Sequence, residues 1–223
     1  LGVDGTGAGL LAAVHEAPAP AGWRSLRACA ATLTPEELDR AVTAVSLGRW
    51  LRDAPFCAAC GARTQIAQAG WSRQCPSCGG THFPRTDPAV IVAITNAAGD
   101  RILLGSNAAW PADRYSCFAG FAEAGESLED AVRREVLEEA GVLVRDPVYQ
   151  GSQPWPYPRS LMLGFRAVTD AETAQADGEE IVDARWFTRA EIAAAHAGEG
   201  RFTLPGPASI AFRMIGDWLA EAP

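Results

Sequence analysis

Lysine is absent from this chain, and positive charge is scarce overall. All 19 basic side chains are arginine, and 27 acidic side chains leave a formal net charge of −8. This surplus of negative charge argues against generic affinity for a nucleic-acid backbone or an anionic membrane surface. Arginine can nevertheless hold a phosphate through two parallel hydrogen bonds, so local phosphate-binding sites remain compatible with the composition.

Long apolar runs are absent as well. The longest, Ala89–Ile94, has the length of a strand and falls far short of the ~20 residues that a membrane-spanning helix needs. Residues 1–11 are rich in glycine and begin with leucine, so they lack the basic and apolar segments of a signal peptide. We expect a chain that crosses no membrane, lies in the cytoplasm and lacks its true start.

Cysteine is too scarce for a disulfide scaffold, with six in 223 residues. Cys29 and Cys117 stand alone and are predicted to be small buried hydrophobes. The others form two Cys-x-x-Cys pairs, each followed by a glycine that permits a tight turn toward one ion. Four thiolates suit a closed tetrahedral zinc site, so we predict one structural zinc ion, with two separate redox pairs or four unligated thiols as the alternatives. The predicted ligands are Cys57, Cys60, Cys75 and Cys78.

The patterns divide the chain into three predicted domains. An N-terminal domain, which we expect to be truncated, covers residues 1–53, a zinc ribbon covers 54–83, and an α/β domain covers 84–223. Within the first domain, Thr34 as N-cap and Pro35 at the first helical position predict a helix. Its apolar residues recur at roughly helical spacing, which predicts an apolar face.

The third domain carries clear element signals. Ala89–Ile94 and Arg101–Leu104, separated by a short turn, predict a β-hairpin. Ser127 as N-cap and Gly141 just past the end bracket a helix of about thirteen residues. A final helix is predicted over 209–219. The face of the first helix expected to be buried consists of Leu128, Val132, Val136 and Ala140.

Three carboxylates crowd a different face of that predicted helix. Glu135, Glu138 and Glu139 stand at i, i+3 and i+4, where like charges repel, and near a helix C-terminus, where the helix dipole disfavours anions. A cation should therefore neutralise them. Arg133 and Arg134 can do so in part, and carboxylates in this arrangement suit Mg²⁺ or Mn²⁺, which favour oxygen ligands and often bridge to phosphates.

This region resembles a known motif. Gly120, Glu126 and Arg134–Val142 match the Nudix box, G-x5-E-x7-R-E-U-x-E-E-x-G-U, at all nine specified positions. The resemblance implies an α+β chain in which the Nudix α/β/α sandwich follows the zinc ribbon and a partial N-terminal α/β domain. It also implies a hydrolase that cleaves a nucleoside diphosphate linked to another group, with Glu126 and Arg134 fixing the loop onto the helix.

A second segment narrows the resemblance. Residues 152–160, Ser-Gln-Pro-Trp-Pro-Tyr-Pro-Arg-Ser, resemble the S-Q-P-W-P-F-P-x-S signature of the NADH pyrophosphatase branch, with Tyr157 in place of the usual phenylalanine. Alternating prolines predict a stiff, extended backbone here. Members of this branch carry a zinc ribbon ahead of the Nudix domain, hydrolyse NADH or NAD⁺ to nicotinamide mononucleotide and AMP, and remove NAD caps from RNA 5′ ends.

The resemblance also implies site roles. Glu135, Glu138 and Glu139 are the implied catalytic metal ligands for magnesium or manganese, joined by Glu180 and the carbonyl of Ala119. Phe83 and Phe121 are expected to sandwich the nicotinamide, often in a pocket that a homodimer shares. The remaining implied substrate-binding residues are Gln153, Pro154, Trp155, Pro156, Tyr157, Pro158, Arg159, Ser160, Ala211 and, as an N-terminal counterpart, Arg27.

Other interpretations of the sequence stay open. The same fold can act mainly on NAD-capped RNA, or on a different substrate such as ADP-ribose or a nucleoside triphosphate. A protein of another class, a non-catalytic regulator in which the zinc ribbon dominates and the Nudix fold senses a nucleotide, predicts a broken box. All the carboxylates of the box are intact here, which favours an enzyme.

Overall fold

The computed structural model describes residues 1–3, 5–15 and 19–221. Contacts divide the chain into two compact units, which we call the ribbon unit and the sandwich unit. The ribbon unit is Leu1–Thr86 together with Pro154–Ser160. The sandwich unit is Asp87–Gln153 together with the chain from Leu161 onward. No helix among the described residues is long and apolar enough to span a bilayer.

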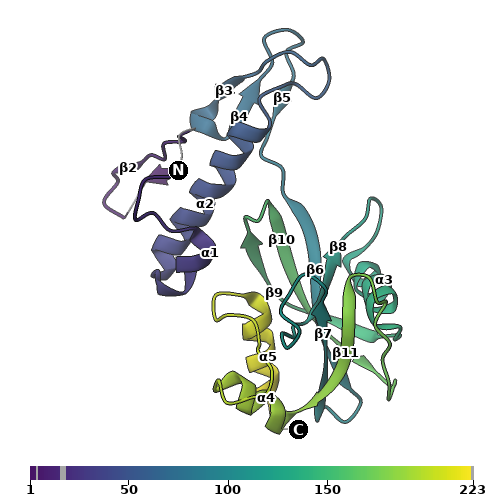
Figure 1. The fold of residues 1–223 in the computed structure, drawn as a ribbon. Coiled ribbons are helices and arrows are strands. Elements are labelled where there is room, and N and C mark those ends of the chain that lie inside the picture. Colours follow the sequence, from purple (N-terminus) through teal and green to yellow (C-terminus); the bar gives the residue numbers. More distant parts are fainter. Residues whose placement is uncertain (4, 16–18, 222–223) are drawn as a thin grey trace. The chain divides into compact units, whose positions relative to one another are not determined.

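The ribbon unit combines one long helix and shorter helical turns with small sheets (Figure 1). Thr34 and Glu37 form a reciprocal capping box at the start of its long helix, which confirms the predicted start. The predicted apolar face is only partly buried: Leu47 is buried, whereas Leu38, Val42 and Val45 are half-buried. The elements are β1 (Gly2–Val3), β2 (Gly9–Leu10), α1 (Leu26–Cys29), η1 (Ala30–Thr32), α2 (Pro35–Asp53), β3 (Gln65–Ala67), η2 (Gln68–Gly70), β4 (Ser72–Gln74) and β5 (Thr81–His82).

A buried arginine joins the cysteine-bearing sheet to α2. Arg73 on β4 is only 5% exposed, and burial lowers its pKa. Its Nε donates to the Thr64 hydroxyl at 2.6 Å, and its two terminal nitrogens donate to the carbonyls of Thr64 and Leu51. Leu51 lies in the last turn of α2. The Arg73 cation therefore satisfies a carbonyl at the helix end and interacts favourably with the negative end of the helix dipole.

The sandwich unit is one six-stranded sheet with helices on both faces (Figure 1). The hydrogen-bonded strand order is β11-β7-β6-β10-β9, and β8 also pairs with β6. The predicted hairpin is confirmed as β6 and β7. The elements are β6 (Asp87–Asn96), β7 (Arg101–Asn107), β8 (Phe118–Phe121), α3 (Leu128–Ala140), β9 (Arg145–Trp155), β10 (Ser160–Thr169), β11 (Ile181–Thr188), α4 (Arg189–His196) and α5 (Ile210–Ala220).

Strand β6 shows how the two layers of core arise. Its residues Val90, Val92 and Ile94 pack in one cluster with buried residues of α3, while Ile91 and Ala93 pack in the other with α4 and α5. Side chains alternate between the faces of a strand, so a strand covered on both faces needs an unbroken apolar run. The α/β/α sandwich and the α+β class are confirmed.

The helix that bears the acidic face forms as its sequence predicts. The Ser127 hydroxyl accepts the N–H of Asp130 at the start of α3, and Gly141 takes the left-handed conformation after its end. Three of the four residues predicted for the buried face are buried completely. The final helix predicted over 209–219 is confirmed as α5, which begins after its N-cap Ser209 and buries Ile210, Met214, Ile215 and Trp218.

The two isolated cysteines behave differently from each other. Cys117 lies in the sandwich core at 5% exposure, as predicted, and burial raises the pKa of its thiol to about 12. The prediction for Cys29 is wrong: it is only half-buried, because the short helix α1 has no buried residue.

Candidate active site

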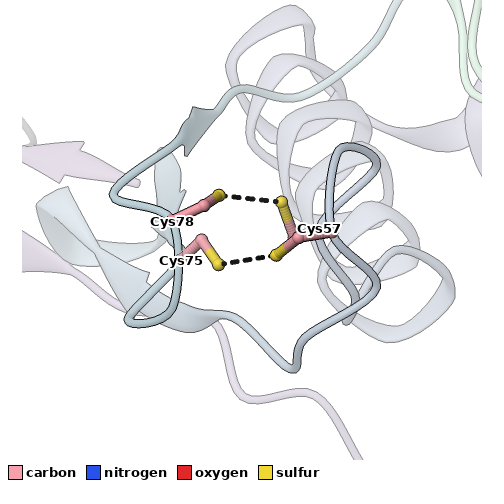
Figure 2. Close-up of side chains that lie close together, drawn as sticks. Cys57, Cys75 and Cys78 are labelled. Atoms are coloured by element: carbon pink, nitrogen blue, oxygen red, sulfur yellow. Dashed lines mark hydrogen bonds between the residues drawn. The ribbon is translucent and has the colours of Figure 1, made fainter.

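The four predicted zinc ligands meet in the ribbon unit. The Sγ atoms of Cys57 and Cys78 are 3.6 Å apart, those of Cys60 and Cys75 are 3.5 Å apart, and all four ligand atoms lie within 4.8 Å of one another. Figure 2 shows the facing sulfur atoms. Two loops far apart in the sequence bring these pairs together, and the cysteines are unpaired by disulfides.

Both loops have the same backbone pattern. The N–H groups of Cys57 and Cys75 each donate to the carbonyl five residues later, at 2.8 Å. Gly61 and Gly79, each in the left-handed conformation, donate back to those same cysteines. The repeated turn leaves other N–H groups directed at sulfur, and the N–H of Cys78 is the largest cause of a Cys75 pKa lowered to about 6. Four converging thiols, two of which, Cys57 and Cys75, have a pKa lowered chiefly by backbone N–H groups, fit zinc.

One histidine lies beside this cluster. His82 Nε2 is 3.2 Å from the Cys57 sulfur. With four sulfurs available to a tetrahedral ion, the imidazole is placed to hydrogen-bond a ligand sulfur.

In the sandwich unit, Arg134 organises the start of the acidic face. Its guanidinium holds Glu126 with two bonds of 2.8 and 2.9 Å and donates to the Phe121 carbonyl at 2.8 Å. Glu126 in turn accepts the N–H of Glu123. The Arg134 side chain is the largest cause of a Glu126 pKa lowered to about 2. These bonds tie the loop after β8 to α3.

Arg134 also supplies the expected countercharge. It contacts a carboxylate oxygen of Glu135 at 2.8 Å and one of Glu138 at 3.2 Å. Arg133 contributes no such contact, because it pairs with Asp130 on another face of the helix, 2.9 Å away. One guanidinium therefore faces several carboxylates, and the acidic face keeps a surplus of negative charge.

Glycine at position 120 makes room for the Glu135 carboxylate. A Cβ atom on Gly120 would lie 2.0 Å from the Glu135 carboxyl carbon, closer than any real Cβ contact. Gly120 belongs to β8, so the carboxylate packs directly against the strand backbone. Its side chain is only 13% exposed, and burial raises the pKa of Glu135, although Arg134 opposes this shift.

Glu139 is the most strongly perturbed carboxylate of the set. It is 4% exposed, and its Oε2 atom has no hydrogen-bond partner among the described residues. Burial, reinforced by the charges of Glu180, Glu135 and Asp177, raises its pKa to about 8, while the Ala119 N–H acts in the opposite direction. A carboxyl group buried beside other carboxylates must either bind a proton or have its charge neutralised by a cation.

The remaining predicted ligands are more exposed. Glu138 is 60% exposed, and Glu180 lies exposed just before β11, with Asn107 Nδ2 3.4 Å from its Oε1. Across the described ranges, the cysteines are the only group of three or more such ligand atoms within 4.8 Å of one another. The unsatisfied Glu139 oxygen and the carboxylates around it nevertheless fit a hard divalent cation, which favours oxygen ligands.

The proline-rich segment differs from its prediction. Instead of staying extended, residues 156–159 form the turn that joins β9 to β10. Arg49 of α2 donates to the Pro156 carbonyl at 2.8 Å, and Arg27 of α1 lies over the Tyr157 ring, 4.7 Å from its centroid. Proline fixes φ but permits a turn, so pairing of the flanking strands decides the backbone path.

Gln153 has a structural role that the sequence pattern did not reveal. Its side-chain amide donates to the Ala208 carbonyl at 2.8 Å and accepts the Ile210 N–H at 2.7 Å, which caps the start of α5. Ala211, in the first turn of that helix, is buried at 4% exposure. By contrast, the two rings predicted to sandwich a nicotinamide, Phe83 and Phe121, are 63% and 55% exposed and each lies at a strand end.

Two polar residues beside Glu180 also escaped prediction. Asn107, at the end of β7, contacts the Glu180 side chain. Asp177, in the loop before β11, accepts the backbone N–H groups of the residues on either side of Glu180. The dipeptide Asp177-Gly178 is a turn signal in the sequence, but only the fold reveals which residue the turn positions.

Family comparison agrees with this architecture. The model of the NUDIX domain family matches residues 85–204, more than half of the chain, and the chain belongs to the Nudix family. The NADH pyrophosphatase zinc ribbon domain matches residues 52–83.

Two curated relatives are both named NAD-capped RNA hydrolases. The chain is 49% identical over 187 residues to the NAD-capped RNA hydrolase NudC of Mycobacterium bovis, covering 80% of this chain and 59% of that protein. It is 40% identical over 184 residues to the NAD-capped RNA hydrolase NUDT12 of Homo sapiens, covering 78% of this chain and 40% of that protein. It thus spans less than two thirds of the length of either.

A solved structure shares the fold. A NUDIX hydrolase from Nitrosomonas europaea superposes with a TM-score of 0.51 at 24% sequence identity, covering 67% of this chain and 96% of that one. At this identity the comparison supports the fold alone.

Proposed function

We propose that this chain hydrolyses the diphosphate bond of NADH or NAD⁺, yielding AMP and the reduced or oxidised nicotinamide mononucleotide respectively, and removes NAD caps from RNA 5′ ends. The observation that carries the proposal is the buried Glu139 carboxylate, whose unpartnered oxygen lies among other carboxylates of an intact Nudix box. The names of the relatives, NAD-capped RNA hydrolases, support this choice of substrate.

The acidic residues have the chemistry of a magnesium or manganese site. Glu135, Glu138 and Glu139 on α3, Glu180 before β11 and the Ala119 carbonyl are the proposed ligands. When bound, the cation would offset the negative charge of the diphosphate and lower the pKa of a water molecule. The protein itself orients these ligands: Arg134 fixes Glu135 relative to the loop, and Gly120 lets the carboxylate approach the strand.

We assign substrate selection mainly to side chains that are not specified by the Nudix box. Trp155 and Tyr157 lie edge to face with ring centroids 5.1 Å apart, which makes an aromatic surface at the turn after β9. Pro154, Pro158, Arg159 and Ser160 complete this segment. Arg27, over the Tyr157 ring, adds positive charge suited to a phosphate. Exposed Phe83 and Phe121 are proposed to stack on the nicotinamide in a homodimer that shares its pocket.

The test compares substrates and matched variants. Purified zinc-loaded protein with Mg²⁺ or Mn²⁺ is incubated separately with NADH, NAD⁺, ADP-ribose and 5′-NAD RNA, and products are resolved by chromatography. We expect nicotinamide mononucleotide and AMP from the free dinucleotide, strong loss in Glu138→Gln, and retention in Glu129→Gln, an exposed glutamate in the first turn of the same helix. Cleavage of ADP-ribose alone, or equal activity in both variants, would contradict the proposal.

A further inference from the structure

Glu180 is in an unfavourable place for a metal ligand, because it is exposed and follows a segment without regular secondary structure, residues 170–180. A carboxylate on such a segment samples many positions, and binding a cation then costs the entropy of ordering it. The surrounding contacts, all within the sandwich unit, remove much of this freedom.

Asp177 holds the backbone on both sides of Glu180. A single oxygen, Asp177 Oδ1, accepts the N–H of Glu179 at 2.8 Å and the N–H of Ile181 at 2.9 Å. Gly178, with φ at +80°, donates its N–H to the Ile181 carbonyl at 2.9 Å and closes the turn. Glu180 therefore occupies the middle of a small loop whose two neighbours share one acceptor.

Strand β7 and the residue that follows it hold Glu180 itself. The Ala108 N–H donates to the Glu180 carbonyl at 2.9 Å, and Asn107 Nδ2 lies 3.4 Å from Glu180 Oε1. The Asn107 side chain is oriented in turn, because its Oδ1 accepts the Ala109 N–H at 2.9 Å. The next residue after Glu180, Ile181, is 5% exposed in the core, which anchors the end of the loop.

The placement matters because Glu180 and the buried Glu139 stand on elements that pack together. Ile181, the residue after Glu180, lies in one core cluster with Val136 and Ala140 of α3, which stand on either side of Glu139 in the sequence. Asp177 is itself a carboxylate close to Glu180 in the sequence, yet one of its oxygens is already committed to two backbone N–H groups.

We propose that Asp177 is a positioning residue for the acidic site: through the N–H groups of Glu179 and Ile181 it holds Glu180 where Glu180 can bind a divalent cation together with Glu139. Asn107 supports the same carboxylate from β7. This inference rests on the proposed function only for the identity of the cation. It assigns Asp177 the role of a hydrogen-bond acceptor, whereas a direct ligand would act by its charge.

Mn²⁺ binding to the zinc-loaded chain, followed by electron paramagnetic resonance, tests this role without substrate. We expect Asp177→Ala to weaken Mn²⁺ binding by about 10-fold or more, as losses of supporting groups at metal sites do. Asp177→Asn keeps an acceptor oxygen and should bind Mn²⁺ much more nearly as wild type does. Glu172→Ala, an exposed control in the same segment whose carboxylate pairs with Arg101, should not change the affinity.

Two further measurements separate positioning from other causes. If Asp177 acts through Glu180, the effects of Asp177→Ala and Glu180→Ala on Mn²⁺ affinity must not add in the double variant. In the zinc-loaded protein without Mn²⁺, the Glu179 and Ile181 amides should exchange hydrogen faster in Asp177→Ala and at nearly the wild-type rate in Asp177→Asn. Since Asp177 is exposed, these variants are expected to fold, which circular dichroism checks.

Several results would overturn the inference: unchanged Mn²⁺ affinity in Asp177→Ala, an equal loss in Asp177→Asn, or additive losses with Glu180→Ala. If wild-type protein binds Mn²⁺ and the variants behave as expected but no dinucleotide is cleaved, the proposed function fails and the positioning role stands.

Discussion

Replacing Gly120 with alanine tests the packing of the acidic site directly. Gly120 has no positive φ, so alanine is compatible with its backbone. The added Cβ would lie 2.0 Å from the carboxyl carbon of Glu135 and about equally close to both carboxylate oxygens, at 2.2 and 2.1 Å. The three nearest atoms all belong to this one side chain, so the Glu135 carboxylate must move.

The magnitude follows from the contact that is lost. Moving the carboxylate breaks its 2.8 Å bond to Arg134, and the Glu135 side chain is only 13% exposed, so water replaces little of that bond. A hydrogen bond between charged groups contributes about 1.5–3 kcal/mol. We expect Gly120→Ala to lower the free energy of unfolding by about this amount, or Tm by roughly 3–12 °C, and to reduce diphosphatase activity severely.

Urea unfolding of four proteins gives the answer: wild type, Gly120→Ala, Glu135→Ala and the double variant. Because Glu135→Ala removes the clashing group, Gly120→Ala should cost little in that background. Gly206→Ala, at an exposed glycine with open space around its Cβ position, serves as the control. If Gly120→Ala lowers the free energy of unfolding equally in the Glu135→Ala background, or no more than the control does, the Glu135 carboxylate is not what the added Cβ displaces.

Three other predictions concern stability. Chelation of zinc, or Cys75→Ser, should unfold the ribbon while the sandwich persists, since the ribbon has little core of its own; metal analysis and hydrogen exchange by segment check this, and equal protection with and without zinc contradicts it. The Cys117 thiol has a pKa raised to about 12 from 9.0, so its stabilisation is complete below pH 9 and is lost as the pH rises toward 12. Between pH 9 and pH 10, Cys117→Ala should therefore lose about 1 kcal/mol less unfolding free energy than wild type, and parallel pH profiles contradict this. Gly216→Ala, inside α5 with its Cβ at 3.5 Å from His196 Nε2, should raise stability by about 0.5–1 kcal/mol in thermal unfolding, and a lower Tm would show that the contact is too tight.

Local signals predicted the parts of the fold that local physics controls. The caps of α3, at Ser127 and Gly141, and the hairpin of β6 and β7 follow from backbone groups satisfied by near neighbours. The paired cysteine motifs predicted a converging sulfur cluster because four ligands for one ion must meet. The unbroken apolar run of β6 likewise required a strand covered on both faces.

Features that depend on contacts between distant parts of the chain could not be predicted from the sequence. The stiff segment around Tyr157 turns because β9 and β10 pair on either side of it, and α2 leaves most of its apolar face half-buried. Arg133 and Arg134 are adjacent and chemically equal, yet only Arg134 faces the acidic cluster. The link between Asp177 and Glu180 depends on a loop geometry that no periodicity describes.

If the acidic site of α3 directs water at a dinucleotide diphosphate, one oxygen of the products must come from the solvent. Hydrolysis of NADH in water enriched in ¹⁸O, with mass spectrometry of the products, follows that oxygen. We expect reduced nicotinamide mononucleotide and AMP, with a single ¹⁸O atom on one of the two new phosphates, and neither product from Glu139→Gln. Release of free nicotinamide, or unlabelled products from the wild-type chain, would contradict it.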